Sequence, residues 1–207
     1  INGKILTPPN LKGQWHNLKV AEELSKLINK PVYLENDANL AGLAEAVVGE
    51  GKDYNYVQFF TVSTGLGAGF VINKEIYHGA HGFGNEVANC VMMKDGPSHG
   101  SIIPGGIEAI SSGTAITSRA VKAGLDVKHA GEVNDLAKAG NEVAKQIMDD
   151  AKEYLANFIG VVYGYADPEI VILGGSVALK IDGFVEEVEA LAKERVYEIM
   201  KSIDRKS

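Results

Sequence analysis

Residues 61–69 read Thr-Val-Ser-Thr-Gly-Leu-Gly-Ala-Gly and lie between two apolar runs, 56–60 and 70–72. Two strand-like segments joined through three alternate glycines predict a β-hairpin with a bare backbone at its turn. Gly65, Gly67 and Gly69 lack Cβ atoms and can adopt positive φ angles, so consecutive N–H groups can face one concavity that suits phosphate. For this motif alone, a tight hairpin of small residues without a ligand remains the alternative.

The composition excludes several classes of protein. The 207 residues suffice for one large domain, or for one domain and part of another. The net charge is −7, and no basic run is long enough to follow a nucleic-acid backbone. There is one cysteine, Cys90, so no intrachain disulfide can form. No stretch approaches the roughly 20 apolar residues of a membrane span, and no signal-peptide pattern opens the chain. We therefore expect a cytoplasmic protein that does not bind a membrane, and we expect no nucleic-acid binding by this segment of it.

Upstream of the hairpin, the pattern predicts a helix capped by Asn17, a strand at 32–34 after Pro31, and a second helix that begins near Asp37. Residues 1–5 read like the end of a strand pair. Asn36 and Asp37 fall between the end of a strand and the start of a helix, where open α/β sheets bind ligands. The alternative that these two side chains only cap the helix is equally open.

Downstream, residues 77–86 and 94–106 are rich in glycine and other small residues and predict irregular loops. Glu86 ends the first loop, and Glu108 follows the second. A short helix is predicted near Ile107, with serine and threonine side chains available to cap or bend it.

Helical periodicity predicts a long core helix from about Asn141 to a break at 167–168, and a last helix at 183–200. Between them, residues 169–173 are apolar after the first, as in a strand buried on both faces. This strand runs into Gly174 and Gly175. A glycine pair there allows a flat ligand to approach the backbone, but ordinary strand-to-helix turning is an open alternative.

Five stretches, taken in order, resemble the ROK family of bacterial sugar kinases and repressors. They are residues 35–39, 61–69, 82–89, 105–116 and 167–175. The resemblance spans nearly the whole chain, and its weight lies in the order and spacing of the pieces. It implies the actin-like, ribonuclease-H-like α/β fold of sugar kinases. Residues 1–38 would then be the tail of a small N-terminal domain, and residues 39–207 most of a large C-terminal domain.

The resemblance also implies roles for single residues. Asp37 falls on the catalytic base, which accepts the proton of the attacking sugar hydroxyl and orients it toward the γ-phosphorus. The implied sugar-binding positions are Asn36, Asp37, Glu86, Asn89 and Glu108. The implied positions for ATP with Mg²⁺ are Thr64, Gly65, Gly67, Gly69, Gly174 and Gly175.

The chain departs from the family pattern at the zinc loop. Asn89 stands where the family has a histidine that serves both sugar and zinc, and residues 99–108 lack the family's cysteines. A structural tetrahedral site needs about four nitrogen or sulfur ligands. We therefore expect no structural zinc. By resemblance, we also expect a homodimer.

The family's first phosphate loop, which serves Mg²⁺, has no counterpart from Ile1 onward, and neither have its terminal strands and helix. We therefore expect a fragment that is inactive as a kinase by itself. For the whole protein, we expect ATP-dependent phosphorylation of a hexose or hexose derivative, as in glucokinase. The alternative is a sugar-sensing ROK repressor whose DNA-binding part lies outside this chain. Asp37 and the glycine loop favour the kinase.

Overall fold

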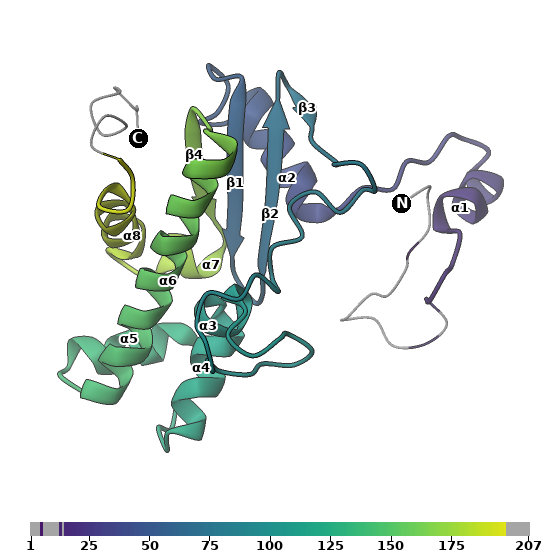
Figure 1. Ribbon diagram of the computed structural model, residues 1–207. Helices are drawn as coiled ribbons and strands as arrows, with labels where there is room; N and C mark the ends of the chain where they lie inside the picture. The colour runs from purple at the N-terminus through teal and green to yellow at the C-terminus, as the bar shows by residue number, and fades with distance from the viewer. Residues whose placement is uncertain (1–4, 6–12, 14, 198–207) are drawn as a thin grey trace.

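The computed structural model describes residue 5, residue 13 and residues 15–197 (Figure 1). Its sheet has the strand order β3-β2-β1-β4, with β1 (Tyr56–Val62), β2 (Leu66–Ile72), β3 (Glu75–Ile76) and β4 (Ile170–Gly174). Helix α2 (Asp37–Val48) covers one face, and a group of helices led by α6 (Glu142–Ala166) covers the other. The remaining helices are α1 (Val20–Ile28), α3 (Ile107–Ser111), α4 (Gly113–Lys122), α5 (Ala130–Lys138), α7 (Ser176–Lys180) and α8 (Phe184–Lys193).

The predicted hairpin is confirmed. Strands β1 and β2 are antiparallel, Val62 pairs with Leu66, and residues 63–65 form the turn. Strand β4 lies parallel to β1 on the other side. A parallel neighbour requires a crossover connection, and the long segment that contains α3 to α6 supplies it.

Side-chain alternation along the strands builds a core on each face of the sheet. On one face, Val57 and Val71 pack with Ala46 of α2 in a small cluster. On the other, Phe60 belongs to a much larger cluster that α6 dominates, and its ring meets that of Phe158 edge to face at 5.8 Å. The helices behind α6 complete this larger core.

The long helix predicted from Asn141 is confirmed as α6. Asn141 caps it by accepting the N–H of Ala144 at 3.0 Å, and Asp167 ends it in the left-handed conformation at φ 43°. Its buried side chains recur three and four residues apart, which makes one continuous stripe toward the sheet. They are Ala144, Ile147, Met148, Ala151, Leu155, Ala156, Phe158 and Ile159.

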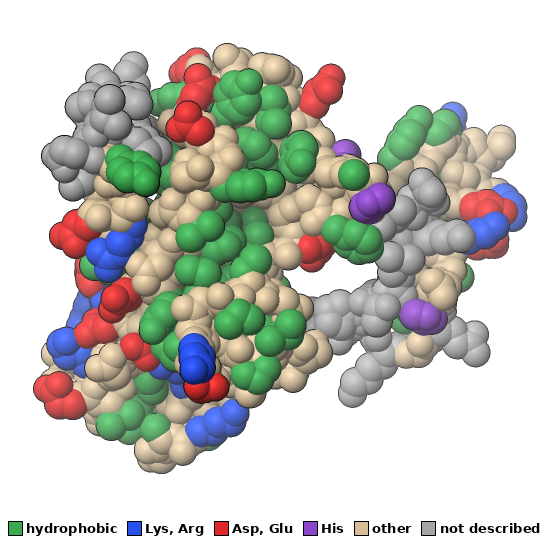
Figure 2. Space-filling view, viewed as in Figure 1, with side chains coloured by type: hydrophobic (Ala, Val, Ile, Leu, Met, Phe, Trp, Pro, Cys, Tyr) green, Lys and Arg blue, Asp and Glu red, His purple; other side chains and the backbone are tan. Residues whose placement is uncertain are grey.

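The outer surfaces of the helices carry interspersed charges. Figure 2 shows acidic and basic side chains alternating over the side formed by α5, α6 and α8. Lys152 of α6 pairs with Glu187 of α8, and Lys138 of α5 pairs with Asp182 at 3.4 Å. The Lys138–Asp182 pair is exposed, and exposed pairs contribute little to stability, so helix packing rests mainly on the apolar core.

The expected strand at 32–34 is wrong. Residues 31–36 have no regular structure, and Tyr33 is 91% exposed. A strand needs a neighbouring strand to pair with, and none of the described residues forms such a β-ladder with this segment. The segment instead forms an extended connector between α1, which stands apart in Figure 1, and α2.

The expected cap at Asn17 is also wrong. Helix α1 begins at Val20, Asn17 has a positive φ of 58°, and the cap position, Lys19, makes no side-chain cap bond. The strand pair expected at residues 1–5 lies outside the described residues except for Ile5, which forms an isolated bridge with Leu18.

Two expectations at the C-terminal side need correction. In β4 only Ile170 is buried and the other residues are half-buried, because β4 forms an edge of the described sheet. The last helix, expected at 183–200, is shorter, since α8 ends at Lys193. Residues 198–200 lie outside the described part.

Candidate functional site

The first turn of α2 presents two polar side chains. Asn36 Oδ1 accepts the N–H groups of Ala38 at 2.8 Å and Asn39 at 3.1 Å, so Asn36 is the helix cap. Asp37 Oδ1 accepts the Ala38 N–H at 2.9 Å. Both side chains are exposed, and Asp37 Oδ2 makes no bond to the residues that the structure describes. The capping role expected of Asn36 is therefore real, and it leaves the amide of Asn36 and one Asp37 oxygen open.

Two glycines of β2 let α2 lie directly against the strand. A Cβ on Gly69 would come within 2.8 Å of the Ala38 carbonyl oxygen, and one on Gly67 within 3.1 Å of the Ala38 Cβ. Neither glycine has a positive φ, and neither has Gly65. The expected concavity of N–H groups along Gly65, Gly67 and Gly69 is therefore wrong in its geometry, because the last two lie inside a paired strand.

The hairpin turn itself is held by the start of α4. Gly113 N donates to Ser63 O at 2.8 Å, and the Thr114 hydroxyl donates to Thr64 O at 2.6 Å. The N–H groups of Thr64 and Gly65 donate to no group within the described ranges. The turn thus carries two unpaired N–H donors in fixed peptides, an arrangement that suits an anion.

Glu108 joins the turn to the neighbouring loop. Its Oε2 accepts the Leu66 N–H at 2.8 Å, and its own N–H donates to Ala88 O at 3.2 Å. In the same loop, Asn89 Oδ1 accepts the Ile103 N–H at 2.8 Å. Glu108 therefore supports the hairpin turn with one carboxylate oxygen and keeps the other, Oε1, without a bond to any described residue.

Gly174 and Gly175 end β4 beside the end of β1. Gly175 has φ 92°, and a Cβ on it would lie 2.5 Å from the Val62 carbonyl oxygen. The next residue, Ser176, places its Oγ 3.1 Å from Ser63 Oγ. The turning and packing role is therefore sterically required at Gly175, and the pair lies against the same hairpin end as Thr64.

The side chain of Glu86 makes no described contact with this cluster. It is exposed, and its N–H donates to Phe83 O at 3.3 Å. It lies two residues before Ala88, which Glu108 contacts. The other predicted residues gather at the hairpin end of the sheet: Asn36 and Asp37 through Ala38, Gly67 and Gly69 in β2, Thr64, Gly65, Asn89, Glu108, Gly174 and Gly175.

No role was predicted for Glu35, but in the structure its carboxylate joins three donors. Its Oε1 accepts the Asn36 N–H at 2.8 Å and the Asn39 side-chain amide at 2.9 Å, and its Oε2 lies 2.7 Å from His78 Nε2. Burial alone would raise the pKa of this carboxyl, but the bonds from Asn39, His78 and the Asn36 N–H together hold the pKa below its usual value. Its position directly before the capping pair was the available signal.

Metal ligands are not grouped in the described part of the chain. Among residues 5, 13 and 15–197, no three His, Cys, Asp or Glu side chains are close enough together to hold a metal ion. In the same part, no helix is long and apolar enough to cross a membrane.

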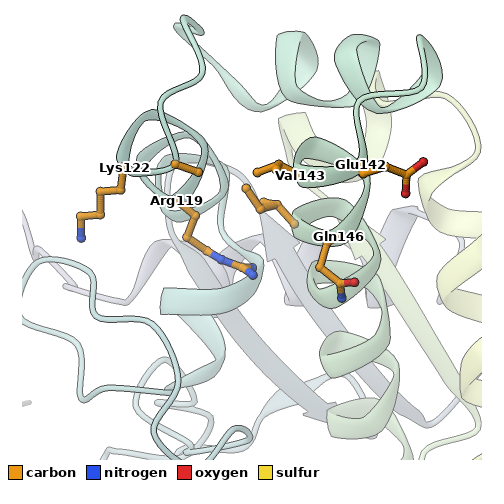
Figure 3. A pocket seen from close by; sticks show the side chains of 7 residues that line it. Arg119, Lys122, Glu142, Val143 and Gln146 are labelled. Atoms are coloured by element: carbon orange, nitrogen blue, oxygen red, sulfur yellow. The ribbon is translucent and has the colours of Figure 1, made fainter.

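A surface groove of about 580 Å³ lies between the end of α4 and the start of α6 (Figure 3). It shares no residue with the predicted site. Arg119 at its wall is already paired with Asp150 of α6, and the rest of the lining mixes charged or polar side chains with apolar ones. The convergence of polar groups at the hairpin, rather than this groove, marks the candidate site.

This sheet, with α2 on one face and the α6 group on the other, defines the class as the actin-like fold of sugar kinases. The ROK hexokinase from Thermus thermophilus has this fold and superposes with a TM-score of 0.80 at 30% identity, over 86% of this chain and 62% of that one. The chain belongs to the ROK family, whose sequence profile matches residues 1–205.

Relatives within the family differ in function. A glucokinase from Thermotoga maritima is 32% identical over 86% of this chain and 60% of its own length. A xylose repressor from Caldicellulosiruptor bescii is 28% identical over 95% of this chain and 52% of its own length. The chain thus spans between about half and two thirds of these proteins. Family membership covers both sugar kinases and sugar-responsive repressors.

Proposed function

We propose that the protein of which this chain is a part is an ATP-dependent sugar kinase that phosphorylates a hexose or hexose derivative. Residues 39–207 would be most of its large domain and residues 1–38 the tail of its small one. A kinase that draws on ATP would act in the cytoplasm. A homodimer remains a prediction by family resemblance.

One observation carries the proposal. Asp37 Oδ2 and the N–H groups of Thr64 and Gly65, none of which bonds to a described residue, lie at the same end of β2, since Ala38 packs on Gly67. Phosphoryl transfer needs a carboxylate that orients the attacking hydroxyl and donors that hold the phosphates. This end of the sheet offers both kinds of group.

We also propose roles for the remaining predicted site residues in the same reaction. Asn36, Glu86, Asn89 and Glu108 would hold sugar hydroxyls. Because Asn89 and Glu108 each have one oxygen already engaged, they offer the ligand their remaining polar atoms. Gly174 and Gly175 would border the nucleotide, and Mg²⁺ bound with ATP would neutralise charge on the phosphates.

The second candidate is a sugar-sensing repressor, supported by the likeness to the xylose repressor. A sensor needs a sugar pocket but neither a catalytic base nor a phosphate site. Sugar-dependent ADP release by the full-length protein, measured over a panel of aldohexoses, amino sugars and pentoses, separates the two. Sugar binding without ADP release across the panel would favour the repressor.

The substitution Asp37→Asn tests the catalytic role. It keeps the size of the side chain and loses the proton acceptor, so we expect kcat to fall by at least about 100-fold while sugar still binds. The matched control is Asp53→Asn, the same change at an exposed residue in the turn after α2. Wild-type turnover by the Asp37 variant would show that the base lies elsewhere.

A further inference from the structure

A short chain of hydrogen bonds runs from the loop at residues 98–106 to the hairpin turn. His99 Nε2 lies 2.9 Å from Thr114 Oγ1, and the Thr114 hydroxyl lies 2.6 Å from Thr64 O. The Thr114 N–H also donates to Thr64 O, at 3.3 Å. These three residues come from a loop, from the start of α4 and from the turn between β1 and β2.

The direction of this chain follows from the number of protons. Thr114 has one hydroxyl hydrogen, and a carbonyl oxygen such as Thr64 O accepts and never donates. The hydroxyl hydrogen therefore goes to Thr64 O. Thr114 Oγ1 is left as an acceptor toward the imidazole, so His99 must carry a proton on Nε2.

This series of hydrogen bonds ends at the peptide group between Thr64 and Gly65, in the hairpin turn. Thr64 C=O and Gly65 N–H belong to one peptide, so hydrogen bonds received by the oxygen polarise the N–H and strengthen it as a donor. They also fix the orientation of that peptide. The Gly65 N–H is one of the two donors that remain unpaired within the described residues.

We propose that His99 is a positioning residue that, through Thr114, orients and polarises the Gly65 N–H for a nucleotide phosphate. This rests on the proposed kinase function. His99 does not touch the phosphate itself in this scheme. The chemistry recognised is that of a nucleoside triphosphate, whose anionic oxygens accept from the turn.

Binding of AMPPNP to the full-length protein, measured by calorimetry, tests the proposal. We expect His99→Ala and Thr114→Val each to weaken binding by roughly two- to tenfold, the range for one hydrogen bond, with sugar affinity unchanged. Both substitutions break the same series of hydrogen bonds. The double variant should therefore bind AMPPNP no more weakly than the weaker-binding of the two single variants. His99→Gln, which retains an N–H donor, should restore most of the affinity.

Lys122→Met is the control, since Lys122 Nζ donates to Ser98 O at 3.4 Å and holds the same loop without joining the chain. It should bind AMPPNP like the wild type. Nitrogen NMR of His99 in the wild type gives an independent readout, and we expect a protonated Nε2. An unprotonated Nε2, additive losses in the double variant, or wild-type binding by His99→Ala would each overturn the inference alone. Failure of the wild type to bind AMPPNP would overturn the proposed function and this inference with it.

Discussion

At the scale of single residues, Glu35 and His78 fasten two parts of the site to each other. Glu35 belongs to the connector before α2, and His78 to the loop that leads toward Glu86. A carboxylate that accepts three donors fixes both the cap residue Asn36 and this loop. The position of Asp37 therefore depends on a neighbour that takes no part in the proposed chemistry.

This arrangement predicts a dependence of stability on pH. The folded pKa of Glu35 lies below its unfolded value, which is about 4.3. Its stabilising effect is therefore fully present above about pH 4.3 and is lost as the pH falls through the lower, folded pKa. We expect Glu35→Gln to reduce the free energy of unfolding at pH 7 by about 1 kcal/mol.

Urea unfolding between pH 3 and pH 7 measures this effect. The difference between wild type and Glu35→Gln should shrink toward the acid end. Glu50→Gln, at an exposed glutamate just after α2, should show no such difference. A gap between wild type and the Glu35 variant that stays constant with pH would exclude the assigned role.

At the scale of elements, α2 lies so close to β2 that side chains at the glycine positions of β2 would crowd it. Gly69→Ala would place a methyl group 2.8 Å from the Ala38 carbonyl oxygen. The backbone cannot easily yield there, so we expect a loss of about 1–3 kcal/mol in stability and a displaced Asp37. The melting temperature, measured by thermal unfolding, and kcat should therefore both fall.

Gly164→Ala is the matched control. Gly164 lies in α6, and a Cβ there would meet nothing within 4 Å. Alanine in a helix interior is favoured over glycine by roughly 0.5–1 kcal/mol, so this variant should be slightly more stable than the wild type. Equal behaviour of the two alanine variants would contradict the packing argument.

Elements with a strong local pattern could be predicted from the sequence. The hairpin was predicted from two apolar runs joined through glycines, and α2 and α6 from the helical spacing of apolar residues; all three elements were confirmed. The strand at 32–34 failed because apolar residues alone do not make a strand without a neighbour. The paired state of Gly67 and Gly69 was missed because glycine spacing looks the same in a turn and in a strand.

At the scale of the whole molecule, the candidate site assembles from segments far apart in sequence. Resemblance to the family named its residues, but the contacts of Thr114 and His99 could not be found that way, because Thr114 donates to a backbone carbonyl and His99 contacts Thr114. Such contacts depend on how the loop at residues 98–106 folds back on α4. Short sequence patterns do not predict how this loop packs against α4.

The same loop leads to a prediction about zinc. Asn89 Oδ1 accepts the Ile103 N–H at 2.8 Å, so a hydrogen bond links residue 89 to this loop. We expect purified, untagged protein to contain far less than one zinc per chain by elemental analysis. A chelator should leave its melting temperature unchanged. One zinc per chain, retained through dialysis against the chelator, would show that the loop holds metal.

The close approach of α2 to β2 also bears on how motifs in this family are interpreted. Whether or not a nucleotide binds, a Cβ at position 69 would lie 2.8 Å from the Ala38 carbonyl oxygen, and one at position 67 would make a tight contact of 3.1 Å with the Ala38 Cβ. The presence of Gly69 is therefore not by itself a sign that ATP binds. The Gly-x-Gly-x-Gly pattern therefore reflects the packing of a helix on a strand. If the proposed function holds, the positions that would discriminate a catalyst from a sensor are instead Asp37 and the Gly65 N–H, which donates to no described residue.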